Sequence, residues 1–188
     1  MATAHGFQGQ FRADDLKFPL ASPYSTETCA VFDRTAGKYY VRELLHHLGE
    51  DVAAGTHGVR DTAAQVVQRL ATVMAGAQPE SWPLEVETTA SILTYTFALP
   101  SGDRLAALWH TTPITDEDTI VSVTLRLPGL ATDAAVYAIQ VLDGYQQRLI
   151  TAQEEEGLIV KDVLLREYPL LIRIVPRRKL YLPLIIRE

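Results

Sequence analysis

From residue 79 onward, the apolar residues of this chain repeat with a period of two. Short runs rich in Val, Ile, Leu and Tyr are separated by turn signals, such as Pro-Ser-Gly-Asp at 100–103 and Asp-Gly at 143–144, where Gly supplies the positive φ that a reversal needs. No helix-length segment interrupts these runs, so parallel strands joined by crossover helices are not expected there. The pattern predicts a mainly β protein, an antiparallel two-sheet β-sandwich of about eight strands.

Each expected strand is a short period-two run that ends at a turn signal. A last extended run follows the sandwich strands and is also rich in apolar residues. In chain order, the predicted strands lie at roughly 83–88, 91–99, 104–110, 119–127, 134–142, 145–152, 157–161, 168–174 and 179–187.

The chain before residue 79 has a helical period instead. Apolar residues recur at helical spacing over 35–48, where Gly49 is expected to end a short amphipathic helix. A second helix is predicted to begin with Asp61 as its cap and to run to about residue 75, ended by Gly76. The Gly-containing segment between the two helices is predicted to be a loop.

Three regions follow from this change of period. Residues 1–33 show no sustained period and are predicted to form an irregular N-terminal arm. Residues 34–78 form the two-helix segment, and residues 79–188 form the β-sandwich domain.

Composition excludes several classes of function. The net charge of -6 and pI near 5.4 disfavour nucleic acid as a partner, because nucleic-acid binders concentrate Lys and Arg on one face.

No run is long enough to span a bilayer, and the first residues lack a signal peptide, so we expect a cytoplasmic protein or a fragment of a larger one. Cys29 is the only cysteine and allows no intrachain disulfide. The absence of Asn and the thirteen Arg to four Lys suggest a thermophilic or GC-rich source.

Several segments together resemble one family of accessory domains. The segments are Lys-Tyr-Tyr-Val-Arg-Glu-Leu-Leu-His-His-Leu at 38–48, the helix-like stretch 64–79, Leu-Ala-Ala-Leu-Trp at 105–109, Leu-Pro-Gly-Leu at 127–130, Val-Tyr-Ala-Ile-Gln-Val-Leu-Asp-Gly-Tyr at 136–145, and Val-Leu-Leu-Arg-Glu-Tyr-Pro-Leu-Leu-Ile-Arg at 163–173. Through them, the chain resembles the C-terminal β-sandwich attached to (β/α)8-barrel glycoside hydrolases of the large retaining clan, together with the last two barrel helices. The resemblance covers about residues 35–174.

The resemblance implies a fold but not an active site. A retaining glycosidase needs two carboxylates about 5 to 5.5 Å apart, one of them a proton donor. The family's donor belongs to an Asn-Glu pair on the fourth barrel strand, and this chain has neither that strand nor any Asn. Glu27, in Ser-Thr-Glu-Thr at 25–28, matches the position of the family's nucleophile before the seventh helix. A solvated loop carboxylate is the favoured reading of Glu27, because a single unpaired Glu lacks the partner that this chemistry requires.

No metal or cofactor site is predicted. His46 and His47 are adjacent on a helix, so their side chains point about 100° apart and cannot both bind one ion without further ligands. The acidic loop at 115–119 lacks the Gly and the alternating spacing of a calcium loop and is predicted to be a solvated turn. The sequence also lacks a phosphate-binding loop and a nucleophile elbow.

Two aromatic residues are candidates for carbohydrate binding. Trp109 shares strand parity with Leu105 and is expected in the core. Trp82 and Tyr145 lie beside turns and are predicted to be freer, so a bound sugar would stack on those two.

The apolar helix faces predict an interface. In a complete enzyme they would pack on a barrel that this chain does not encode, and each large side chain is worth about 1.5 to 3 kcal/mol when fully buried. We expect these faces to find one of three kinds of cover: the sandwich of the same chain, a second copy of the chain, or a separate catalytic chain. The residues predicted to form this interface are Tyr40, Leu44, Leu48, Val66, Leu70 and Val73.

The sequence as a whole favours a structural or interaction module without its own catalysis. It would form a homo-oligomer or support a barrel-containing catalytic chain that acts on carbohydrate. The alternatives are a carbohydrate-binding β-sandwich and a subunit or remnant of a retaining glycoside hydrolase.

Overall fold

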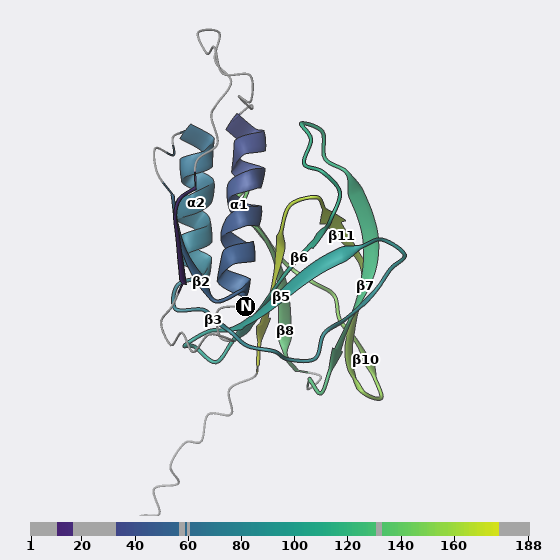
Figure 1. Ribbon diagram of the computed structural model, residues 1–188. Helices are drawn as coiled ribbons and strands as arrows, with labels where there is room; N and C mark the ends of the chain where they lie inside the picture. Colours follow the sequence, from purple (N-terminus) through teal and green to yellow (C-terminus); the bar gives the residue numbers. More distant parts are fainter. Residues whose placement is uncertain (1–10, 17–32, 57–58, 60, 131–132, 177–188) are drawn as a thin grey trace, which may run out of the picture.

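The described part of the chain is mainly β, with two helices, two antiparallel sheets and one two-stranded sheet. The mainly β, antiparallel architecture predicted from the period-two pattern is confirmed. The computed structural model describes residues 11–16, 33–56, 59, 61–130 and 133–176. Figure 1 shows the two helices side by side, next to the sheets. One face of the six-stranded sheet packs on the helices and the other on the four-stranded sheet, so the six-stranded sheet forms the middle of three layers. Among the described residues, no helix has the length and apolar character needed to cross a membrane.

Both sheets of the sandwich are antiparallel throughout. The six-stranded sheet has the order β3 (Gln78–Pro79), β5 (Ile92–Ala98), β6 (Arg104–His110), β12 (Leu170–Val175), β8 (Ala135–Gln140), β9 (Tyr145–Arg148). The four-stranded sheet has the order β10 (Ala152–Glu154), β11 (Gly157–Arg166), β7 (Ile120–Pro128), β4 (Glu85–Glu87).

The predicted strand at 145–152 proves to be two strands. Residues 145–148 form β9 in one sheet and residues 152–154 form β10 in the other, so the chain changes sheets between them. The prediction for 157–161 was too short, because β11 continues to Arg166 across a bulge between Val160 and Val163. The final predicted run at 179–187 lies outside the described residues.

Both predicted helices are present, with slightly different ends. Helix α1 spans Asp33–Gly49 and α2 spans Asp61–Val73. The cap of α2 was predicted to be Asp61, but the carboxylate of Asp33 accepts hydrogen bonds from the backbone N–H groups of Thr62 and Ala63, at 2.9 and 3.2 Å. Gly76 follows α2 with φ of 71°, as expected for a residue that ends a helix. Asp33 therefore ties the start of one helix to the start of the other.

The N-terminal region contains two strands that the sequence analysis missed. β1 (Phe11–Leu16) lies in the segment predicted as an irregular arm, and β2 (Val52–Thr56) lies in the predicted loop. The two strands pair in parallel, so the order β1, α1, β2, α2 forms a crossover unit. Neither strand has the sustained alternation of large apolar residues that would reveal it. In β2 the reason is that Ala and Gly make up most of the strand.

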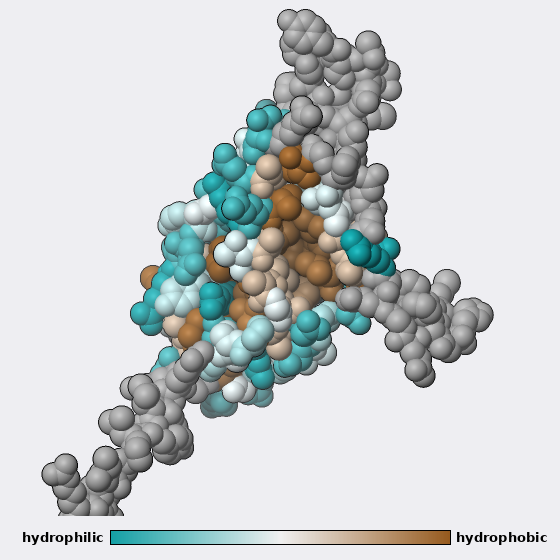
Figure 2. Space-filling view, turned by 90° about the vertical axis from the view of Figure 1, so that its left-hand side faces the viewer, coloured by the Kyte–Doolittle hydropathy of each residue, from teal (hydrophilic) through white to brown (hydrophobic). Residues whose placement is uncertain are grey.

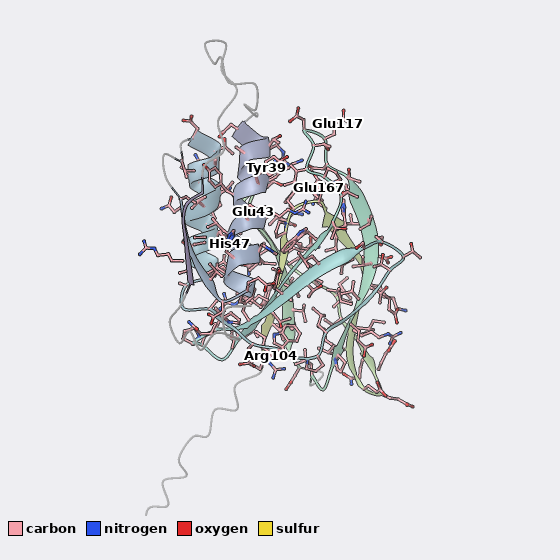
Figure 3. All side chains as sticks on the ribbon, viewed as in Figure 1. Tyr39, Glu43, His47, Arg104, Glu117 and Glu167 are labelled. Atoms are coloured by element: carbon pink, nitrogen blue, oxygen red, sulfur yellow. The ribbon has the colours of Figure 1, made fainter. Side chains whose placement is uncertain are left out.

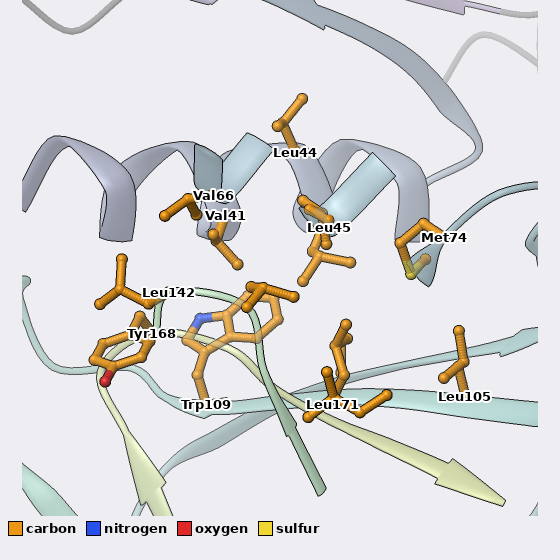
Figure 4. Close-up of a cluster of buried hydrophobic side chains, with 14 of the residues drawn as sticks. Val41, Leu44, Leu45, Val66, Met74, Leu105, Trp109, Leu142, Tyr168 and Leu171 are labelled. Atoms are coloured by element: carbon orange, nitrogen blue, oxygen red, sulfur yellow. The ribbon is translucent and has the colours of Figure 1, made fainter. Parts of the chain in front are cut away.

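The six-stranded sheet has an apolar core on each of its faces. Along β6, Leu105, Ala107 and Trp109 belong to the core shared with the helices, while Ala106 and Leu108 belong to the core between the sheets. Figure 4 shows the helix-side cluster, with the fully buried Trp109 ring beneath α1 and α2. The expectation that Trp109 is a core residue is confirmed.

The six residues predicted to form an interface pack within the chain. Four of them are at most 7% exposed, and the other two are partly buried against the helix-side core. The sandwich supplies the cover that a barrel would give, because the outer face of its six-stranded sheet is itself apolar. Among the three outcomes expected for the apolar helix faces, the structure shows packing within the chain for Tyr40, Leu44, Leu48, Val66, Leu70 and Val73.

Candidate functional site

The most polar buried site joins α1 to the sandwich. The Lys38 ammonium on α1 is fully buried and lies 2.7 Å from Oε1 of Glu167, which is also fully buried. The same ammonium lies 2.8 Å from Oδ1 of Asp118 and donates to the carbonyl oxygen of Thr115 at 2.8 Å. The second oxygen of Glu167 accepts the backbone N–H of Thr119 at 2.9 Å. Figure 3 shows Glu167 between α1 and the strands, near the loop that carries Glu117.

Asp118 is surrounded by cations. Its Oδ2 lies 3.2 Å from Arg34 Nη2 and 3.1 Å from Arg166 Nε, and it accepts the hydroxyl of Tyr168 at 3.3 Å. Burial by itself would raise the pKa of Asp118, but Lys38 and the two arginines outweigh it and lower that pKa overall. Burial raises the pKa of the Tyr168 phenol, which therefore stays protonated. Asp118 is accordingly ionised at neutral pH.

This arrangement brings two carboxylates together without the chemistry of a glycosidase. Asp118 and Glu167 both lie against the same Lys38 ammonium, whereas a retaining pair needs one carboxyl kept protonated as the donor. Lys38 and Glu167 have no exposed side-chain surface through which a substrate could reach them. The cluster is thus suited to fixing α1 on the sandwich rather than to catalysis.

An open groove runs between the edges of the two sheets. It has a volume of about 500 Å³ and is lined by residues of β8 and β9 on one side and of β11 on the other. Tyr145, at 57% exposed, and Leu164, at 50% exposed, both line it. The prediction that Tyr145 is accessible agrees with this position.

A second groove, of about 450 Å³, lies at the β10–β11 hairpin. Four glutamates line part of it, and Arg126 at its wall forms ion pairs with Glu87 and Glu154. Within the described part of the chain, no group of three or more His, Cys, Asp or Glu side chains has a metal-binding geometry.

The remaining predicted site residues do not lie together in one site. Trp82 is only 7% exposed and packs in the core between the sheets, so the prediction of a freely accessible indole there is wrong. Glu27 lies outside the described residues. His46 Nδ1 lies 2.7 Å from the hydroxyl of Tyr95, and that hydroxyl donates to Glu50 at 2.9 Å.

Sequence reasoning missed the Lys38 cluster, although a signal was present. Lys38 precedes Val41 by three residues and Leu45 by seven, which places a charged residue on the apolar face of α1. A lysine at such a position needs a buried partner. The partner residues could not be identified in the same way, because Asp118 and Glu167 are 80 and 129 positions further along the chain.

Comparison with known proteins finds similarity to solved structures at low identity and a low TM-score. No protein-family model matches the chain, and no curated protein matches it. Two solved structures of a GH27 β-L-arabinopyranosidase from Geobacillus stearothermophilus, the wild type and a variant in complex with arabinose, align with a TM-score of 0.47 and 11% identity. The alignments cover 89% and 87% of this chain, respectively. The chain corresponds to only 38% and 37% of those two chains.

Proposed function

We propose that this protein is a non-catalytic structural and interaction module related to the accessory β-sandwich of glycoside hydrolases. It associates through the open edges of β1 and β2. The observation that carries the proposal is the parallel pairing of these two strands, which have no other strand partner among the described residues.

A parallel pair of this kind is incomplete by itself. Parallel strands are ordinarily buried within larger sheets, and a two-stranded sheet is marginally stable in water. All five residues of β2 are half-buried. Figure 2 shows apolar residues gathered in the middle of the face that carries the helices and these strands. Exposed strand edges and apolar surface together favour pairing with another chain.

The two edges favour a second copy of this chain as the partner. The outer edge of β1 and the outer edge of β2 run in the same direction, so β2 of one copy can pair in parallel with β1 of the next. Such head-to-tail contacts form a ring when the rotation closes. An eight-stranded parallel barrel would take about four copies at two strands each. A barrel-containing catalytic chain would use the same edges as an alternative partner.

The buried charge cluster supports a role without catalysis. The best-placed pair of carboxylates, Asp118 and Glu167, is occupied by Lys38 and closed to solvent on the Glu167 side. A glycosidase needs its pair at an open cleft, with one acid protonated.

Sedimentation equilibrium over a range of protein concentrations tests the proposal. Ala54 packs toward the helices, so its neighbour Ala53 points to the opposite face of the sheet. That face would become the interior of the closed barrel, where Ala53→Lys would bury an unpaired charge. We expect the unaltered chain to approach the mass of about four copies, and we expect Ala53→Lys to remain monomeric.

The matched control is Ala71→Lys on the exposed surface of α2, which should associate like the unaltered chain. A chain that stays monomeric at every concentration contradicts self-association. A mass increase only on adding a barrel-containing chain would identify the alternative partner.

A further inference from the structure

We propose that the groove between β8–β9 and β11 binds a neutral glycan segment, with the Tyr145 ring as its stacking platform. This inference is independent of the proposed association, because the groove lies on the sandwich and shares no residue with β1 or β2.

The groove lies where β10 stops covering the edge of β11, beside β8 and β9 of the other sheet. The side chains of Gln140, Tyr145 and Gln147 share one face of β8–β9, since Gln140 is paired with Tyr145 and Gln147 is two residues further on. β10 pairs with β11 only as far as Ile159, so the β11 segment from 161 to 166 has no strand on that side among the described residues. The groove runs along this uncovered segment, and its volume of about 500 Å³ suits one or two sugar rings.

Its lining combines one aromatic face with several hydrogen-bonding groups. The Tyr145 side chain is 57% exposed, and its hydroxyl donates to Gln147 Oε1 at 3.4 Å. An aromatic ring with a negative face attracts the C–H groups on the flat side of a pyranose. The amides of Gln140 and Gln147 can each donate to and accept from sugar hydroxyls.

The charges of the lining favour a neutral ligand. Two carboxylates, Asp143 and Asp162, are balanced by Lys161 and Arg166. Two of these four groups are already paired elsewhere: Asp143 Oδ1 accepts from Arg34 at 2.8 Å, and Arg166 Nε lies 3.1 Å from Asp118. The groove therefore has no excess of either sign to attract a phosphate or a basic peptide.

An extended peptide is the competing occupant, because β11 exposes an edge there. That edge carries features that oppose strand pairing. The register of β11 shifts at a bulge between Val160 and Val163, Asp162 has a positive φ of 56°, and Lys161 beside it is charged. A peptide strand would lose regular backbone hydrogen bonds at the bulge. A glycan needs no continuous ladder.

Calorimetric titration with a panel of neutral oligosaccharides of hexoses and pentoses tests the proposal. We expect at least one of them to bind. Tyr145→Ala should weaken its affinity by roughly tenfold or more, which corresponds to about 1.4 kcal/mol. Tyr145→Phe should retain the affinity within about threefold, because it keeps the ring and loses only the 3.4 Å hydrogen bond.

The control variant is Ile150→Ala, which removes a side chain that is 92% exposed and does not line the groove. Its affinity should equal that of the unaltered chain, and circular dichroism should show all three variants folded. The proposal is overturned if no oligosaccharide binds, if binding survives Tyr145→Ala, or if an extended peptide binds at this groove in preference to every glycan.

Discussion

The β-sandwich and the β1–α1–β2–α2 segment differ in how they complete their hydrogen bonds and cores. In the described part of the sandwich, ten strands form two antiparallel sheets, with an apolar core between them. In the N-terminal segment, two parallel strands pair only with each other among the described residues, and the helices depend on the sandwich for their apolar cover. Apolar cover can be provided by any complementary surface, whereas the backbone groups of a strand edge pair either with another strand or with water. The helices thus pack on the sandwich within the chain, and the proposed association would pair β1 and β2 with a second chain.

The largest expected effect concerns the contact between these two regions. Lys38→Met leaves the Glu167 carboxylate buried without its cation, and we expect the free energy of unfolding to fall by about 3 to 5 kcal/mol. Urea denaturation measures this loss. Lys161→Met, at an exposed site, is the matched control and should change stability by less than about 0.5 kcal/mol.

A double variant distinguishes the lost ion pair from lost packing. Lys38→Met combined with Glu167→Gln removes both charges and should recover part of the loss. Equal stability of Lys38→Met and Lys161→Met would show that the buried pair does not hold α1 on the sandwich.

The second effect concerns the end of α1. A Cβ at Gly49 would overlap the ring of Tyr95 on β5, so we expect Gly49→Ala to lower the thermal midpoint through a loss of about 1 to 3 kcal/mol. Gly37→Ala is the comparison, because its Cβ would meet the movable Leu142 methyl at 2.9 Å. Equal losses at the two positions would contradict a rigid contact between α1 and β5.

The third effect tests the link between the helices. Asp33→Ala removes the acceptor for two N–H groups at the start of α2, and we expect a loss of about 1 kcal/mol in chemical denaturation. Asp33→Asn retains a side-chain oxygen and should lose less. If Ala and Asn variants are equally stable, Asp33 does not cap α2.

The smallest effect is a dependence of stability on pH. The pKa of Asp118 is lowered in the folded state, so its contribution is complete above the unfolded value of about 3.9 and is lost as the pH falls through the lower folded value. We expect the thermal midpoint of the unaltered chain to fall more steeply below about pH 4 than that of Asp118→Asn. Parallel curves would contradict an ionised, cation-bound Asp118.

The two regions also differ in how far the sequence predicts them. Period-two runs and turns locate β5, β6, β7 and β8 closely, because alternate residues of these strands face apolar cores. β2 has no such pattern, since Val-Ala-Ala-Gly-Thr offers little contrast between its faces. The change of sheet between β9 and β10 depends on long-range packing and leaves no local signal.

The candidate sites are predictable to a smaller degree. Tyr145 follows the Asp143-Gly144 turn, and that local signal indicates its exposure. Trp82 also lies beside a turn, yet the fold buries it between the sheets, where its ring lies 5.8 Å from the Arg104 guanidinium. Burial depends on which residues meet in three dimensions, and neighbours in sequence do not reveal it.

Amide hydrogen exchange tests the central claim most directly, because it reports β1–β2 and the sandwich strands in one sample. At low protein concentration, we predict that the amides of β1 and β2 exchange far faster than those of β6 and β12, which lie inside the six-stranded sheet. At high concentration, protection should rise in β1 and β2 and stay unchanged in β6 and β12. If β1 and β2 are protected as strongly as β6 and β12 at the lowest concentration, their edges need no second chain, and the account of an association module is wrong.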